Sequence, residues 1–73
     1  MPLTAEITLR QIWADVLELD EVDDDDNFFD LGADSMQAVE VVLRAREIGL
    51  NIEVPDLFTT GTLAELATLA AGR

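Results

Sequence analysis

Hydrophobic residues recur at helical spacing in several stretches of the chain, with polar residues at the positions between them. The first stretch predicts a helix over about residues 5–19, with Thr4 as its N-cap. Its apolar face consists of Ala5, Leu9, Ile12, Trp13, Val16 and Leu17. A second helix is predicted over residues 35–48. Its inward face consists of Ala38, Val41, Val42, Ala45 and Ile48.

The second predicted helix has a start signal and a stop signal. Asp34 and Gln37 have the spacing of a capping box, in which each side chain accepts a hydrogen bond from the other residue's backbone N–H. Gly49 followed by Leu50 is typical of a left-handed C-cap with its hydrophobic contact. Both helix boundaries are therefore expected from local chemistry.

The C-terminal part of the chain predicts two further helices. A proline disfavours helix just before it and suits a first helical turn, so a short helix is expected over residues 55–59. Either Leu57 or Phe58 is expected to face inward. Thr62 begins a second capping-box pattern and opens a last helix over residues 62–70.

Residues 20–32 show no helical period and are read as a long first loop. Three hydrophobic residues within it, Phe28, Phe29 and Leu31, are expected to anchor the loop on the core. The fold class is therefore predicted as all-α, a small bundle of three main helices plus one short helix. The whole chain, 1–73, is expected to form a single domain.

The acidic run at residues 23–26 is read as a solvated loop, and it also raises the possibility of a calcium site. The pattern of an EF-hand then fails at two positions. Phe28 stands where the sharp turn needs glycine, and Asp34 stands where a bidentate glutamate is needed. No metal site is predicted.

Composition excludes several classes of function. The formal charge of −12 argues against nucleic acid and anionic membranes as partners, because both require clustered Lys and Arg. The chain lacks cysteine, histidine, lysine and tyrosine, so the usual bases that activate a serine or threonine nucleophile are absent. Carboxylates could still act as acids or bases, but 73 residues leave little room for a shielded pocket around them, and an autonomous enzyme is not expected. No apolar run approaches the roughly 20 residues that span a bilayer. We expect a cytoplasmic monomer.

The most informative stretch surrounds the start of the second predicted helix. Here Leu31-Gly32-Ala33-Asp34-Ser35-Met36 resembles the carrier-protein family, most closely the peptidyl carrier (thiolation) domains of nonribosomal peptide synthetases. The resemblance extends over nearly the whole chain. It includes Ile12-Trp13, Val16-Leu17, Asp26-Asn27-Phe28-Phe29, Leu57-Phe58 and Thr62-Leu63.

The resemblance implies an acyl-carrier-like bundle and a noncatalytic role. A phosphopantetheinyl transferase would attach a 4′-phosphopantetheine arm to Ser35, and the arm would hold aminoacyl or peptidyl groups as thioesters. The candidate cofactor-binding residues are Ser35, Asp34 and Gly32. The implied partners are this transferase, an adenylation enzyme or domain, and condensation, tailoring or thioesterase enzymes.

The local chemistry of Ser35 is compatible with this role. The first turn of a helix has unpaired backbone N–H groups and a dipole that favour a phosphate. Gly32 permits a backbone conformation that exposes the turn, whereas the charges of Asp30 and Asp34 oppose the phosphate. Taken alone, Ser35 is also an ordinary serine at a helix start.

The expected partner surface lies beside the arm, at Met36, Val39, Glu40 and Arg44, with Glu40 and Arg44 placed as an i,i+4 ion pair. Met36, Val39 and Leu43 form a shoulder beside the core face, for which two alternatives are open: completion of the core, or partial exposure for partner contact. Core packing is the expectation for Val39 and Leu43, and less so for Met36.

Two other functions remain open. Ala38-Val39-Glu40 is similar to acyl carriers of polyketide and fatty-acid synthesis. The high negative charge also suits an acidic interaction module that binds a basic partner without a cofactor.

Overall fold

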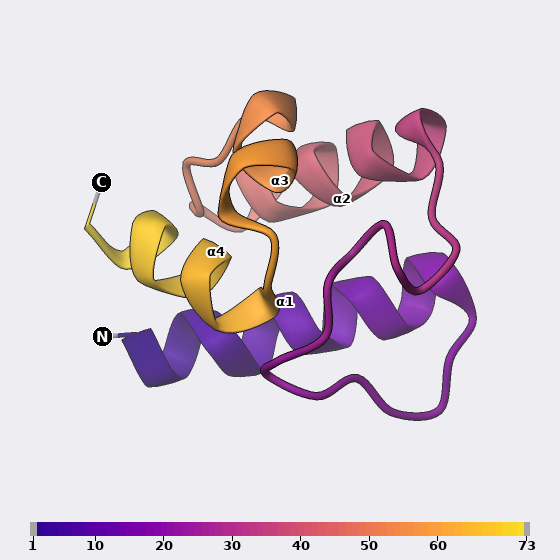
Figure 1. Cartoon of the computed structure of the whole chain (residues 1–73). Coiled ribbons are helices and arrows are strands. Elements are labelled where there is room, and N and C mark those ends of the chain that lie inside the picture. Colours follow the sequence, from indigo (N-terminus) through magenta and orange to yellow (C-terminus); the bar gives the residue numbers. More distant parts are fainter. Residues whose placement is uncertain (1, 73) are drawn as a thin grey trace.

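The computed structural model describes the backbone of residues 2–72 and the side chains of residues 4–72. Four helices follow one another within this part of the chain: α1 (Pro2–Leu17), α2 (Ser35–Glu47), α3 (Val54–Thr60) and α4 (Leu63–Ala71). Figure 1 shows α1 on one side of the bundle and α2 and α3 on the other, with α4 beside α1. The predicted all-α class, with three main helices, a short one and a long first loop, is confirmed.

Helix α1 begins earlier and ends earlier than the sequence pattern predicts. It starts at Pro2, a residue that suits the first helical position, so the predicted N-cap role of Thr4 is wrong. It ends at Leu17 because Glu18 adopts a left-handed backbone with φ of 56°. The N–H of Leu19 then donates to the carbonyl of Ala14 at 2.9 Å, which closes the helix in a Schellman-type turn.

The end of α2 follows the predicted stop signal. Gly49 has φ of 92°, and the N–H of Leu50 donates to the carbonyl of Ala45 at 2.9 Å. Ile48, however, is 58% exposed, so its predicted place on the inward face is wrong. The helix has already ended at Glu47, and Ile48 no longer follows the helical period.

The two C-terminal helices form where they are predicted, and each of their bounds differs from the predicted one by one residue. In α3, Leu57 is the residue that faces inward, with 1% of its surface exposed, whereas Phe58 is 58% exposed. Helix α4 starts directly after Thr62, whose hydroxyl oxygen accepts a hydrogen bond from the N–H of Glu65 at 3.2 Å. The N-cap of α4 is confirmed, but the predicted capping box is wrong in its second half: the N–H of Thr62 donates to the carbonyl of Thr60 at 3.0 Å, and the carboxylate of Glu65 accepts from the Thr62 hydroxyl at 3.1 Å instead.

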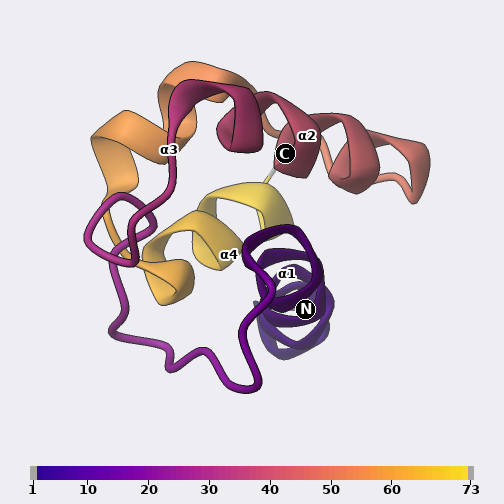
Figure 2. The ribbon, with the colours of Figure 1, turned by 90° about the vertical axis from the view of Figure 1, so that its right-hand side faces the viewer.

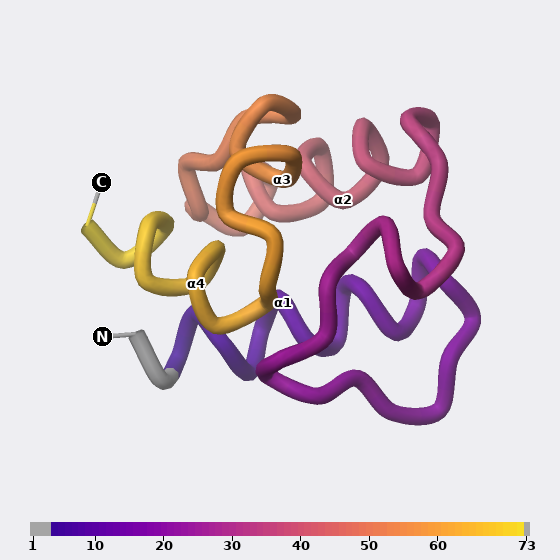
Figure 3. The backbone as a smooth tube through the Cα atoms, in the orientation of Figure 1, coloured from indigo at the N-terminus to yellow at the C-terminus, as the bar shows by residue number. Residues whose placement is uncertain are grey.

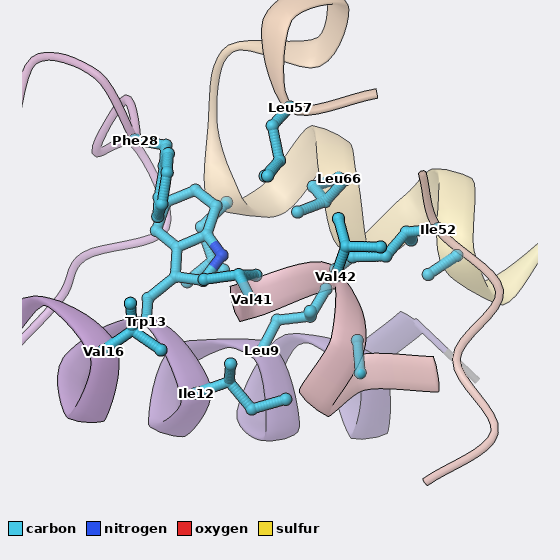
Figure 4. Close-up of a cluster of buried hydrophobic side chains, with 14 of the residues drawn as sticks. Leu9, Ile12, Trp13, Val16, Phe28, Val41, Val42, Ile52, Leu57 and Leu66 are labelled. Atoms are coloured by element: carbon cyan, nitrogen blue, oxygen red, sulfur yellow. The ribbon is translucent and has the colours of Figure 1, made fainter. Parts of the chain in front are cut away.

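The hydrophobic core lies where the four helices meet. α1 packs against α2 and α4, and α3 packs against the same two helices. Figure 4 shows Leu9 and Trp13 of α1 reaching toward Val41 of α2. Trp13 is 1% exposed, and its ring lies edge-on to Phe28, with the ring centroids 5.0 Å apart. The core therefore joins the long loop to the helices through Phe28.

The long first loop, residues 18–34, runs back along the bundle and is fastened to the start of α4 (Figures 1 and 2). The N–H of Leu63 donates to the carbonyl of Asp26 at 3.2 Å, and the N–H of Ala64 donates to that of Asp24 at 3.0 Å. The first N–H groups of a helix have no partner inside the helix. In α4 two of them are satisfied by the loop.

The acidic run is more ordered than a freely solvated loop. Asp24 forms an ion pair with Arg10 of α1, and the carboxylate of Asp26 accepts a hydrogen bond from the N–H of Asp23 at 2.9 Å. Within residues 2–72, no cluster of three or more acidic, histidine or cysteine side chains is arranged to hold a metal ion. In the same residues, no helix has the length and apolar character needed to cross a membrane.

The backbone strain at Glu18 predicts a stabilising substitution. A left-handed conformation costs a residue with a Cβ roughly 1–2 kcal/mol, and glycine avoids this cost. We expect Glu18→Gly to raise the free energy of unfolding by about 1 kcal/mol, measured by urea denaturation with Trp13 fluorescence as the signal.

Glu18→Gln removes the same negative charge and retains the Cβ, so it is the control for relief of charge repulsion. Equal stabilisation by the two variants would show that charge, and not backbone strain, is responsible.

Candidate functional site

Ser35 is the first residue of α2 and is exposed to solvent. The residue before it, Asp34, has an extended backbone and caps the helix. The N–H of Gln37 donates to Oδ1 of Asp34 at 2.9 Å, and the N–H of Asp34 donates to Oε1 of Gln37 at 3.0 Å. The predicted capping box is confirmed. It holds the serine at the outer edge of the first turn.

Two backbone N–H groups remain unpaired at the start of α2. The capping box occupies those of Asp34 and Gln37, whereas those of Ser35 and Met36 have no hydrogen-bond partner within residues 2–72. Such groups, together with the positive end of the helix dipole, can bind a phosphate oxygen. The residues at this turn therefore fit a phosphodiester on the Ser35 hydroxyl.

The charges around Ser35 are unfavourable for a phosphate. Asp30 and Asp34 are both exposed and lie within five residues of the serine. The nearest basic residue that follows it along α2 is Arg44, nine positions later. A phosphate donor that approaches Ser35 must therefore bring its own cations.

Gly32 shapes the turn that leads to Ser35. Its φ is +94°, in the region that residues with a Cβ rarely adopt, and a Cβ added there would meet no atom within 4 Å. Backbone conformation, and not lack of space, therefore requires glycine at this position. Its N–H donates to the carbonyl of Phe29 at 3.1 Å. Gly32 positions the site by bending the loop.

The expected partner residues all lie on an exposed face of α2. Met36 is 77% exposed and Val39 is 40% exposed, and a side-chain oxygen of Glu40 lies 3.6 Å from the guanidinium of Arg44. Leu43 is 58% exposed, so the expectation of core packing for Val39 and Leu43 is wrong. The predicted ion pair is confirmed, and the structure leaves three apolar side chains next to it in contact with solvent.

The helical period already contained a signal for Leu43. Met36 and Leu43 are seven residues apart and therefore share one face, on the opposite side of the helix from Ala38 and Ala45. Ala38 and Ala45 are both fully buried. The hydrophobic side chain of Leu43 suggested a place in the core, whereas its position on the face of the helix opposite the buried Ala38 and Ala45 indicated exposure to solvent.

Phe58 of α3 is a surface residue that the sequence did not assign to the site. Its ring stacks on Phe29 of the loop, with centroids 4.5 Å apart and an interplanar angle of 21°. Phe29 in turn lies edge-on to the buried Phe28. The loop that precedes Ser35 is thereby joined to α3. We call Met36, Val39 and Leu43, which share one exposed face of α2, the apolar surface.

Fold and site together define a helical carrier domain. The family described as "Phosphopantetheine attachment site" matches residues 8–70. The chain belongs to this family, as the resemblance found in its sequence implied.

Similarity to individual proteins extends across most of the chain. This chain is 41% identical over 70 residues to the nonribosomal peptide synthetase ungA′ of Aspergillus campestris. The aligned region covers 93% of this chain and 1% of the synthetase. The chain is also 44% identical over 61 residues to one component of the phenolphthiocerol/phthiocerol polyketide synthase of Mycobacterium tuberculosis, covering 84% of this chain and 4% of that protein.

A solved structure titled "Non Ribosomal PCP domain" superimposes with a TM-score of 0.83 at 40% identity. The alignment covers 89% of this chain and 84% of that one. The chain thus spans most of that solved chain, but only a few per cent of the length of the synthetase and the polyketide synthase component.

The cap of α2 yields a prediction about stability at the site. Replacing an N-cap aspartate by alanine typically costs about 1 kcal/mol. We therefore expect Asp34→Ala to lower the free energy of unfolding by about 1 kcal/mol, whereas Asp34→Asn, which retains the acceptor oxygen, lowers it by much less. Urea denaturation of the two variants measures the difference, and equal losses would contradict the capping role.

Proposed function

We propose that the hydroxyl of Ser35 is the attachment point of the 4′-phosphopantetheine arm. The observation that carries this proposal is the exposed serine at the first position of α2, in a chain of the phosphopantetheine attachment family. Ser35 is also the only serine in the sequence. The unpaired N–H groups of Ser35 and Met36 further support a phosphate at this turn.

In the proposed modification, the Ser35 oxygen forms a bond to the phosphorus next to the pantetheine part of coenzyme A. The pyrophosphate bond of coenzyme A breaks, its nucleotide part leaves with the bonding electrons, and the serine proton passes to a base of the transferase. This chain has no histidine or lysine to act as that base. The attached arm supplies a thiol that holds the cargo as a thioester.

The cargo that the relatives favour is an aminoacyl or peptidyl group. The synthetase relative and the separate carrier domain both belong, by name, to nonribosomal peptide synthesis. We therefore propose adenylation, condensation, tailoring or thioesterase enzymes as partners after the transferase has acted. The cytoplasmic location, the monomeric state and the extent of the carrier domain over residues 1–73 stay predictions.

An acyl carrier of polyketide synthesis is the second candidate, supported by the 44% identity to part of a polyketide synthase. The two candidates differ in the enzyme that loads the arm. Loading by adenylation enzymes with amino acids favours the peptidyl carrier, whereas loading by acyltransferases with malonyl groups favours the acyl carrier.

We propose that partner enzymes dock on Met36, Val39, Glu40 and Arg44, together with the rest of the apolar surface defined above. A row of exposed apolar side chains is costly in water and is typical of a protein contact site. The ion pair of Glu40 with Arg44 borders this row and offers both signs of charge to a partner. The surface begins at the residue after Ser35, so a docked enzyme would have the arm within reach.

Attachment to Ser35 predicts a change in mass. Incubation of the protein with coenzyme A and a broad-specificity phosphopantetheinyl transferase is expected to add one phosphopantetheine, detected by intact-protein mass spectrometry. Ser35→Ala should gain none because the acceptor oxygen is absent. Thr59→Ala, which removes an exposed hydroxyl from α3, should gain one and is the matched control. An unmodified wild-type protein would disprove the proposal, and modification of Ser35→Ala would place the arm elsewhere.

The docking surface predicts a difference between two charge reversals. Arg44→Glu and Arg46→Glu change the net charge equally, and both residues are exposed on α2, but only Arg44 belongs to the proposed surface. With the arm attached, the measured quantity is kcat/KM for loading by an adenylation enzyme. We expect the kcat/KM of Arg44→Glu to be about tenfold lower than that of Arg46→Glu, because a charge contact at the interface is lost only in the first variant.

An exposed ion pair contributes at most about 1 kcal/mol to folding, so both variants should remain folded, as circular dichroism would check. Equal kcat/KM values for the two variants would rule out Arg44 as part of the docking surface.

A further inference from the structure

We propose that Asn27 is a positioning residue for Ser35: its side-chain amide holds the loop in the conformation that presents the serine to the transferase. The inference rests on the proposed attachment of the arm to Ser35. Asn27 lies eight residues before the serine and belongs to none of the groups assigned to the site so far.

The side chain and the backbone of Asn27 both bind the turn that follows it. Oδ1 accepts hydrogen bonds from the N–H groups of Phe29 at 3.0 Å and Asp30 at 3.3 Å. The carbonyl of Asn27 accepts a third, from the N–H of Leu31 at 3.1 Å. An asparagine that folds its side chain over the next residues in this way replaces backbone partners in a tight turn.

Asn27 is itself held by the connection between α3 and α4. It forms an isolated antiparallel β-bridge with Thr62, and the neighbouring N–H of Phe28 donates to the carbonyl of Gly61 at 3.3 Å. Gly61 has φ of +82°, and a Cβ added there would lie 3.1 Å from Nδ2 of Asn27. The approach is close enough that the connection limits where the amide of Asn27 can lie.

The turn held by Asn27 leads directly to the serine. The carbonyl of Phe29 accepts the N–H of Gly32, so every N–H from residue 28 to residue 32 is hydrogen-bonded. The ring of Phe29 is in turn fixed between Phe28 and Phe58. Three residues after Gly32 the chain reaches Ser35. A change in the turn therefore alters where α2 begins relative to the core.

Loss of the Asn27 acceptor should affect recognition more than chemistry. Without Oδ1 the N–H groups of Phe29 and Asp30 form hydrogen bonds with water instead, and the loop populates other conformations. Only a fraction of the protein molecules is then in the conformation that the partner binds. The apparent affinity of the partner equals its intrinsic affinity multiplied by that fraction. Once the complex with the transferase has formed, Ser35 occupies the same position in the variant as in the wild type. KM for the carrier should rise, and kcat should stay near its wild-type value.

The experiment measures transferase kinetics on the full chain, with coenzyme A and varied carrier concentration. Asn27→Ala removes the acceptor of two hydrogen bonds and is expected to raise KM by about threefold to tenfold. Asn27→Asp retains the acceptor oxygen and should stay within about twofold of wild type. Asn27→Gln, which displaces the amide by one methylene, should behave like Asn27→Ala and covers the case in which the alanine variant does not fold.

Ala70→Gly is the control for a general loss of stability. It weakens the last turn of α4, which lies at the opposite end of the bundle from the start of α2 (Figure 3). KM should not change in this variant. A similar rise in KM for Ala70→Gly, a wild-type KM for Asn27→Ala, or failure of Asn27→Asp to restore KM would each overturn the proposal.

Hydrogen exchange distinguishes this proposal from the proposed function. The N–H groups of Phe29 and Asp30 should exchange faster in Asn27→Ala than in Asn27→Asp, whether or not a transferase acts. An unmodified wild-type protein would disprove the role of Ser35 and leave this measurement informative about Asn27. Equal exchange rates in the two variants would disprove the role of Asn27 in the turn.

Discussion

The burial of Phe28 against Trp13 is the contact on which the arrangement of the site depends. Phe28 is fully buried although it belongs to a loop, and it lies edge-on to the indole ring in the centre of the bundle. A loop of this length would otherwise lose much conformational entropy for few contacts. The aromatic anchor offsets that loss and brings the loop backbone next to the start of α4.

Once the loop is anchored, hydrogen bonds determine its course. The N–H groups of Leu63 and Ala64 would be unpaired at the start of α4, and they donate to loop carbonyls. A helix end and an irregular segment therefore satisfy each other's backbone groups. The same bonds fix the point from which the chain turns toward Ser35. Stability of the fold and presentation of the serine thus share one set of contacts.

The site is built for presentation and not for catalysis by its own residues. Ser35 is exposed, acidic residues precede it, and no histidine or lysine exists anywhere in the sequence. In the proposed function, the transferase supplies the base that activates the Ser35 hydroxyl. The net charge of −12 favours partners with basic surfaces and speeds their approach at low salt. The exposed apolar face of α2 is the contact area that we propose for these partners.

The sequence by itself determined the features that depend on neighbouring residues. Asp34 and Gln37 are close enough to cap α2 within one turn, Gly49 stops the same helix, and the stretch from Leu31 to Met36 identified the family. Each of these features depends on residues that are close together in the sequence, so it can be predicted without knowledge of the tertiary structure.

Only the tertiary structure decided which hydrophobic residues are buried and how the loop is held. Leu57 is buried and its neighbour Phe58 is exposed, a choice that the sequence pattern left open, and Asn27 meets Thr62 only after the loop has folded onto α4. No local pattern encodes that meeting. Burial and long-range hydrogen bonds depend on the packing of segments that are distant in the sequence, which is a property of the whole bundle.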